Sequence, residues 1–211
     1  MRSRSDIDVL LRQPGIIAVV RAQKADYLLP LSGALISGGV LAIEITMTTP
    51  NALDAIRSMR SHFGTQALIG VGTVLDAKVC AAALDAGAEF VVSPILCPEI
   101  VEVAHAADRP VMLGAYTPTE AQAAYESGAD FVKIFPADGL GPNYIRALHA
   151  PLPHLRLVPT GGIDLSNVAE FMRAGCAAVG VGSSLISPRI LQEANWGELT
   201  AKAKQFVAVV S

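Results

Sequence analysis

Aromatic residues are scarce in this sequence, and neither sign of charge dominates it. Phe, Trp and Tyr make up 5% of the residues while 52% are hydrophobic, so the core must consist mainly of Ala, Val, Leu and Ile. The formal net charge is -3 and the 16 Lys and Arg residues are scattered, which argues against a nucleic-acid partner. For 211 residues we expect one domain of the barrel or large α/β type, covering residues 1–211.

Cysteine is also rare. The three cysteines are odd in number and far apart in the sequence: Cys80, Cys97 and Cys176. This pattern indicates a reduced, intracellular protein and not one stabilised by disulfides.

The sequence contains no uncharged run long enough for a membrane span. The longest such run, Tyr27–Ile43, is interrupted by Pro30 and the pair Gly38-Gly39. It is shorter than the roughly 20 residues that a membrane helix needs, and it reads as a helix followed by a buried strand. Residues 1–10 are charged and lack the apolar stretch of a secretory signal. We therefore expect a cytoplasmic protein without a membrane partner.

Four segments share a pattern in which an Ala-rich helical stretch ends near a glycine and an apolar run follows. A glycine there suits the left-handed residue that ends many helices. The glycines lie at intervals of 49, 41 and 47 residues: Gly38, Gly87, Gly128 and Gly175. Each interval has room for two strand–helix units, so four such repeats imply eight units.

The apolar runs agree with that count and predict eight strands. They are Ile16–Arg21, Val40–Met47, Ala67–Val74, Phe90–Ile95, Val111–Tyr116, Phe131–Phe135, Leu155–Pro159 and Ala177–Ser183. Helix start signals fall between them, at Thr49-Pro50, Asp76, Pro98-Glu99, Thr117-Pro118, Pro142 and Asp164.

A short extra helix is expected at Asp6–Arg12, and a last helix at Trp196–Val209. Strands that alternate with helices eight times predict a (β/α)₈ TIM barrel with a short N-terminal helix. A doubly wound open sheet is the alternative.

A single lysine, Lys133, stands in the middle of the apolar run 131–136. Alternation along a strand puts it on one face with Phe131 and Phe135. Burial disfavours the charged form of an amine, and a neutral amine is the nucleophile that forms a Schiff base with a carbonyl substrate. The alternative is a structural lysine that pairs with a carboxylate or reaches water at the strand end.

The second predicted strand carries a carboxylate, Glu44, between Ile43 and Ile45. If the isoleucines pack against helices, Glu44 points into the barrel. Lysine and carboxylate would then share one cavity, as an amine nucleophile and a general acid/base.

Glycine-rich sequences end three of the strands. Gly161 and Gly162 follow the seventh strand, and Gly182 and Ser183 end the eighth. In this fold those two strand ends, with a helix N-terminus, form the usual phosphate site. On the third strand, Gly70 and Gly72 allow the close approach either of a ligand or of a packed helix.

The four histidines fall in predicted helices or loops, away from the strand ends, and we expect them on the surface: His62, His105, His149 and His154. Because they form no metal-ligand spacing, the sequence predicts no metal site.

Taken together, six motifs resemble those of the 2-keto-3-deoxy-6-phosphogluconate aldolase family, some of whose members also act on 4-hydroxy-2-oxoglutarate. The motifs lie between Ile16 and Ser184 and read "EIT" from Glu44, "GVGTV" from Gly70, "SP" from Ser93, "KIFPA" from Lys133, "PTGGI" from Pro159 and "GS" from Gly182. The resemblance implies a class I aldolase that needs no metal or other cofactor, is commonly a homotrimer, and makes pyruvate and glyceraldehyde 3-phosphate.

The resemblance also implies roles for individual residues. Lys133 corresponds to the Schiff-base lysine and Glu44 to the general acid/base. The remaining contacts are Thr73 to the pyruvate carboxylate, Pro94 and Phe135 to the pocket wall, Thr160 to the sugar chain, and Gly161, Gly162, Gly182 and Ser183 to the phosphate.

One position departs from the family. Many members carry an arginine four residues after the glutamate, where this chain has Thr48. Arg21, which ends the first strand, resembles a basic residue of part of the family and can compensate for it. Thr160 favours the gluconate sugar, since aldolases for the galactonate epimer tend to have an apolar residue there.

Two other readings remain at this point. A phosphosugar isomerase or epimerase has the same fold, although such epimerases often need a metal. A non-catalytic barrel that binds a phosphate ligand is the reading from a different class, because fold alone does not decide function.

Overall fold

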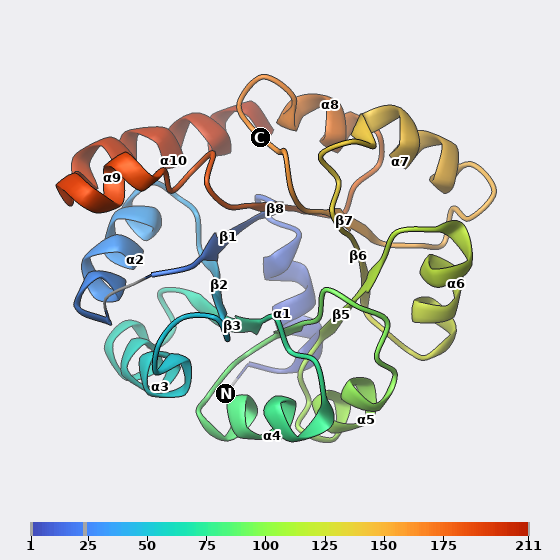
Figure 1. The fold of residues 1–211 in the computed structure, drawn as a ribbon, viewed down its shortest axis with the longest axis horizontal. Helices are drawn as coiled ribbons and strands as arrows, with labels where there is room; N and C mark the ends of the chain where they lie inside the picture. Colours follow the sequence, from blue (N-terminus) through green and yellow to red (C-terminus); the bar gives the residue numbers. More distant parts are fainter. Residues whose placement is uncertain (1, 23–24, 211) are drawn as a thin grey trace.

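Eight parallel strands form a ring that is surrounded by helices (Figure 1). The structure is a computed structural model that describes residues 2–22 and 25–210. The strands are β1 (Ile16–Val20), β2 (Ala42–Thr46), β3 (Leu68–Gly72), β4 (Val91–Val92), β5 (Val111–Ala115), β6 (Phe131–Ile134), β7 (Leu157–Pro159) and β8 (Val179–Val181). Their order is β7-β6-β5-β4-β3-β2-β1-β8, and a parallel bridge from Thr160 to Gly180 joins the two ends of the sheet. The predicted (β/α)₈ barrel is confirmed.

The helices occupy the connections that the sequence predicts. They are α1 (Arg4–Leu11), the 3₁₀ turn η1 (Ala25–Tyr27), α2 (Leu28–Ser37), α3 (Ala52–Phe63), α4 (Ala77–Asp85), α5 (Glu99–Ala106), α6 (Pro118–Glu126), α7 (Gly141–His149), α8 (Val168–Arg173), α9 (Pro188–Glu193) and α10 (Trp196–Val210). Among the described residues, none of these helices has the length and apolar character that a membrane crossing requires.

Side-chain caps fix several helix starts. Asp76 accepts a hydrogen bond from Val79 N, and Thr117 forms a capping box with Glu120, as their positions predict. Two predicted starts are too early. The helix expected at Thr49-Pro50 begins at Ala52, because Asn51 is left-handed with φ 54°. The helix expected at Asp164 begins at Val168, after a turn that the Asp164 carboxylate closes by accepting from Ser166 N.

All four repeated glycines lie at the end of a helix, and three of them are left-handed. Gly87, Gly128 and Gly175 have φ of 101°, 94° and 97°, as a left-handed C-cap requires. The first repeat differs, since Gly38 has φ -88° and Gly39 takes the left-handed conformation. A Cβ on Gly38 would lie 2.3 Å from Cβ of Ala203, so this glycine instead lets α2 pack closely on α10.

The core has two parts that follow the alternation along each strand. Val132 and Ile134 face outward into the layer between strands and helices, whereas Phe131 faces inward. The inward cluster fills the amino-terminal half of the barrel interior. Helix α1, which contributes Ile7 and Leu11, lies across the ring of strands (Figure 1). The members of the cluster are Ile7, Leu11, Ile17, Ala42, Leu68, Phe90, Val92, Met112, Phe131, Val158 and Ala178. The space left for reactive side chains inside the barrel is therefore its other half, toward the carboxyl ends of the strands.

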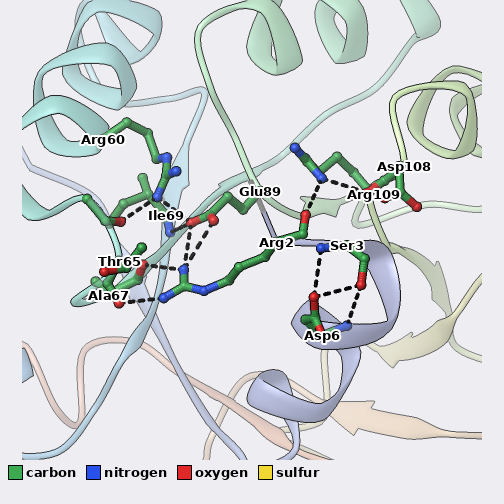
Figure 2. Close-up of polar contacts among 11 residues, drawn as sticks. Arg2, Ser3, Asp6, Arg60, Thr65, Ala67, Ile69, Glu89, Asp108 and Arg109 are labelled. Atoms are coloured by element: carbon green, nitrogen blue, oxygen red, sulfur yellow. Dashed lines mark hydrogen bonds and ion pairs between the residues drawn. The ribbon is translucent and has the colours of Figure 1, made fainter.

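An ion-pair cluster anchors the segment that leads into α1 (Figure 2). The buried carboxylate of Glu89 pairs with Arg2 at 3.1 Å and with Arg60 at 2.6 Å. Arg2 also donates to the carbonyl of Ala67, and Arg109 donates to the carbonyl of Arg2. These contacts hold the closing helix at the amino-terminal face of the barrel.

Candidate active site

Lys133 and Glu44 lie side by side inside the barrel. Lys133 Nζ is 3.8 Å from Glu44 Oε1, and the two residues are 5% and 3% exposed. The alternation argument for both residues is confirmed. At this distance the pair is an ion pair and not a hydrogen bond, and Glu44 Oε1 has no hydrogen-bond partner among the described residues. Glu44 therefore has an acceptor oxygen free for a substrate hydroxyl or a water.

Phe135 lies next to the lysine. Its ring centroid is 5.2 Å from Lys133 Nζ, within the range of a cation–π contact. Phe135 also lines the cavity described below. The aromatic ring thus borders both the amine and the cavity.

Glycines on β3 make room for this arrangement. A Cβ on Gly72 would lie 1.8 Å from Glu44 Oε1, and one on Gly70 would lie 2.4 Å from the ring of Phe90. Neither a helix nor a ligand accounts for these glycines. They leave space for large side chains that cross the barrel interior from β2 and from the residue before β4.

A cavity of about 830 Å³ opens above the pair, at the carboxyl ends of β1, β6, β7 and β8. Val19 lines it and is in register with Glu44. The floor of the cavity therefore reaches the layer of the barrel that holds the buried pair. Its lining residues include Arg21, Tyr27, Phe135, Asp138, Thr160, Gly161, Gly162, Asp164, Gly182, Ser183, Ile186 and Leu191.

The cavity brings together seven of the twelve residues that the sequence singles out, which are Arg21, Phe135, Thr160, Gly161, Gly162, Gly182 and Ser183. Lys133 and Glu44 are not lining residues but adjoin the cavity, because the Phe135 ring centroid lies 5.2 Å from Lys133 Nζ and Val19 is in register with Glu44. Thr48, Thr73 and Pro94 are not among its lining residues. Pro94 packs with its backbone against Gly114, where a Cβ would meet the Pro94 carbonyl carbon at 2.1 Å.

A hydroxyl relay links the ends of β1 and β2. Thr46 Oγ1 is 3.3 Å from the Val20 carbonyl and 2.8 Å from Thr48 Oγ1. Thr46 is buried, while Thr48 and Arg21 are exposed. Thr46 was not predicted as a site residue, although alternation along β2 places it on the same face as Glu44. It ties the backbone before Arg21 to the loop that carries Thr48.

Thr160 projects across β8. A Cβ on Gly180 would lie 2.3 Å from Thr160 Oγ1, so that glycine leaves the space that the threonine occupies. Thr160 is 8% exposed and lines the cavity. Its hydroxyl is available to a polar group bound there.

The two strand ends of the expected phosphate site differ in their backbone geometry. Gly161 and Gly162 are left-handed, with φ of 100° and 69°. After β8, the amides of Leu185 and Ile186 both donate to the carbonyl of Gly182. The expected helix N-terminus is therefore a single hydrogen-bonded turn, and the next helix, α9, begins only at Pro188. Ser183 is exposed and lines the cavity.

Thr73 adopts a left-handed conformation with φ 61°. This conformation is costly for a β-branched residue, and such strain is found mostly at functional sites. No pattern in the sequence predicts this conformation, because threonine favours extended backbone.

The histidines lie away from the cavity. His62 and His154 are exposed, as predicted, but His105 and His149 are half-buried at helix ends. His105 Nε2 is 3.0 Å from Asp130 Oδ2. Within the part of the chain that the structure describes, no three His, Cys, Asp or Glu side chains lie close enough together to hold a metal ion.

The cysteines are free thiols. Burial raises the pKa of Cys80 to about 11 and that of Cys176 to about 12. Both therefore stay protonated near neutral pH and are poor nucleophiles.

Comparison with known proteins agrees with this geometry. The family model described as "KDPG and KHG aldolase" matches residues 7–202. A 2-dehydro-3-deoxy-phosphogluconate aldolase of Pseudomonas aeruginosa is 33% identical over 200 residues, which cover 94% of this chain and 90% of the relative. A 2-dehydro-3-deoxy-6-phosphogalactonate aldolase of Escherichia coli is 37% identical over 171 residues, covering 81% and 83%.

A solved structure adds chemistry to the likeness. The KDPG aldolase of Legionella pneumophila, with pyruvate captured as a covalent carbinolamine intermediate, superposes with a TM-score of 0.86 at 28% identity. The match covers 93% of this chain and 96% of that one. With a family model that spans nearly the whole barrel, and a buried lysine–glutamate pair under its cavity, this chain belongs to the KDPG and KHG aldolase family.

Proposed function

We propose that the protein is a class I aldolase that reversibly cleaves 2-keto-3-deoxy-6-phosphogluconate to pyruvate and glyceraldehyde 3-phosphate. It can also cleave 4-hydroxy-2-oxoglutarate to pyruvate and glyoxylate. The observation that carries the proposal is the buried pair, with Lys133 Nζ 3.8 Å from Glu44 Oε1 below an open cavity. The membership of an aldolase family supports the same reaction type.

Lys133 is the nucleophile in this mechanism. Once Lys133 has passed a proton to Glu44, its neutral amine attacks the C2 ketone and forms a carbinolamine, which loses its oxygen as water when Glu44 returns that proton. The product is a protonated imine. The barrel interior supports this step because it is apolar around the lysine, with Phe131 and Phe135 on the same side of the strand.

Glu44 then acts as a base. It accepts the proton of the C4 hydroxyl, directly or through a water, as the C3–C4 bond breaks and its electrons pass to the imine. The aldehyde product leaves, and the enamine takes a proton at C3. Hydrolysis of the resulting imine releases pyruvate and restores the lysine. The oxygen of Glu44 that accepts no hydrogen bond among the described residues is suited to these transfers.

The remaining predicted residues hold the two ends of the substrate. For the pyruvate carboxylate we propose Arg21 together with the Thr48 and Thr73 hydroxyls and the Pro94 wall, although of these only Arg21 lines the cavity. Arg21 is the basic side chain among the described lining residues of the cavity. Arginine suits planar carboxylates because its guanidinium donates two parallel hydrogen bonds.

For the other end of the substrate we propose Thr160 toward the sugar hydroxyls, and Gly161, Gly162, Gly182 and Ser183 toward the phosphate. All five line the cavity, on the side away from β2. Thr160 favours the gluconate sugar. The galactonate epimer is a second candidate substrate, since the Escherichia coli relative at 37% identity carries that name.

We also propose a cytoplasmic enzyme of carbohydrate metabolism, of the Entner–Doudoroff type, that acts as a homotrimer. Support for self-association comes from three exposed apolar side chains after neighbouring strands: Leu75, Ile95 and Tyr116. A Ser substitution at both Leu75 and Ile95 should shift the mass measured by light scattering toward a monomer. A monomeric mass for the unaltered protein would contradict the trimer.

The function is tested with a panel of substrates. Pyruvate release should be measured from both phosphorylated epimers, from their unphosphorylated counterparts and from 4-hydroxy-2-oxoglutarate. We expect the gluconate epimer to be cleaved with the highest kcat/KM. Preference for the galactonate epimer would assign the second candidate, and cleavage of none of these acids would overturn the proposal.

A further inference from the structure

The carboxylate of Asp138 lies against the two glycines of the expected phosphate site. A Cβ on Gly161 would be 2.2 Å from Asp138 Oδ1, and one on Gly162 would be 2.9 Å from Asp138 Cα. The amide of Ala137 donates to the carbonyl of Thr160 at 2.9 Å, which fixes the Asp138 segment to the end of β7. The two glycines are thus explained by the space that Asp138 needs.

Asp138 is free to act on a ligand. Among the described residues its carboxylate makes no hydrogen bond or ion pair, and it is exposed in the lining of the cavity. The other carboxylate of the lining, Asp164, is different. It accepts hydrogen bonds from the backbone amide and the hydroxyl of Ser166, which lower its pKa and keep it in its own turn.

The charged side chains that line the cavity therefore do not favour the binding of a highly charged anion. The described lining residues carry one cation, Arg21, and two carboxylates, Asp138 and Asp164. Under the function proposed above, Arg21 is taken by the pyruvate carboxylate at the other end. A phosphate against Gly161 and Gly162 meets backbone amides, but it also meets a negative charge.

We propose that Asp138 is a specificity-determining residue that weakens binding of the phosphate, so that the enzyme also takes 2-keto-3-deoxy sugar acids without a phosphate. The physical reason is like-charge repulsion, which acts on the phosphorylated substrate alone. A carboxylate can in addition accept a hydrogen bond from the terminal hydroxyl that replaces the phosphate. This inference rests on the proposed aldolase function and adds the substrate class at its far end.

The test is the ratio of kcat/KM for 2-keto-3-deoxy-6-phosphogluconate to kcat/KM for the same acid without phosphate. In Asp138→Asn this ratio should rise about fivefold, the size expected when one partly exposed charge contact is removed. The rise should be larger at about pH 7.5 than at about pH 5.5, because phosphate esters gain their second charge near pH 6.

Two further variants serve as controls. Asp138→Glu keeps the charge and should keep the ratio of the unaltered enzyme. Asp85→Asn makes the same chemical change at the exposed end of α4, outside the cavity lining, and should also leave the ratio unchanged. An unchanged or lower ratio in Asp138→Asn, or an equal rise in Asp85→Asn, overturns the inference.

A binding experiment separates this inference from the proposed function. Inorganic phosphate, titrated against each variant in a calorimeter, should bind about fivefold more tightly to Asp138→Asn. This measurement needs no turnover. If no acid is cleaved by the unaltered protein, the proposed function fails while the phosphate titration still decides the role of Asp138. Equal phosphate affinity in both proteins overturns that role.

Discussion

The side chain of Glu44 occupies the space that a Cβ on Gly72 would need. The ideal Cβ position is 1.8 Å from Glu44 Oε1 and 2.6 Å from its Cγ. Gly72 therefore sets where the carboxylate lies relative to Lys133, although it contributes no functional group of its own.

Replacing Gly72 with alanine should remove most of the activity while leaving the fold intact. Glu44 must move away from the methyl group, and loss of a positioned general acid/base typically costs about 10²–10⁴ in rate. Steady-state kcat for pyruvate release measures the loss, and circular dichroism reports the fold.

Gly33→Ala is the matched control for that substitution. A Cβ at Gly33, within α2, has no atom within 4 Å, so the change should leave kcat unaltered. In a helix it should even raise the free energy of unfolding by about 0.5–1 kcal/mol. Full activity in Gly72→Ala would show that Glu44 is not needed in its present position.

The sequence was sufficient for the barrel and for the buried pair. Strand alternation alone predicted that Lys133 and Glu44 share the interior, since both stand among large apolar residues that pack outward. The sequence was insufficient where the role of a residue depends on a neighbouring side chain from elsewhere in the chain. Gly72 is explained only by Glu44, which lies on another strand. Likewise Gly161 is explained by Asp138, and no local pattern links these residues.

Local conformation was the second limit of the sequence. Asn51 and Thr73 are left-handed, with φ of 54° and 61°, although neither is glycine. The first delays the start of α3 and the second breaks the extended backbone after β3. Such conformations are held by the surrounding structure and not by the intrinsic preference of the residue.

Arg21→Ala should raise the KM for pyruvate in the condensation direction sharply, by about tenfold or more. Arg21 is the basic side chain among the described residues that line the cavity. A hydrogen bond to a charged group contributes about 1.5–3 kcal/mol. The initial rate of aldol formation at varied pyruvate concentration measures this effect. Unchanged KM with a shifted pH–rate profile would instead make Arg21 a group that sets the charge of Glu44.

Glu89→Ala should destabilise the protein by about 3 kcal/mol, because it leaves Arg2 and Arg60 without their shared buried carboxylate. Urea unfolding gives the change in the free energy of unfolding. Asp54→Ala is the control, since it breaks an exposed ion pair with Arg57 and should cost less than about 1 kcal/mol.

The activity of Glu89→Ala should be retained at temperatures where the protein is folded. The cluster holds the segment before α1 at the amino-terminal face of the barrel, whereas the cavity opens at the carboxyl ends of the strands. A loss of kcat without a loss of stability would contradict this separation of the two faces.

Treatment with pyruvate and borohydride should attach one pyruvate-derived group to Lys133, because reduction traps the imine as a stable secondary amine. The other lysines are Lys24, which lies outside the described residues, Lys78 on α4, and Lys202 and Lys204 on α10, outside the barrel interior. Mass spectrometry of the intact protein counts the added groups, and peptide mapping places them. Lys133→Arg keeps the positive charge but cannot form an imine, so it should lose both label and cleavage.

Glu44→Gln should separate imine formation from proton transfer. The amide keeps the shape of the side chain, so pyruvate can still reach Lys133 and some label should form. Cleavage should fall by about 10²–10⁴, since the amide cannot exchange protons with the C4 hydroxyl. The ratio of label to turnover is the measurement that distinguishes the two roles.

Normal turnover by Lys133→Arg, or a label on a helix lysine, would contradict the Schiff-base mechanism. Loss of label equal to the loss of cleavage in Glu44→Gln would assign Glu44 to imine formation alone.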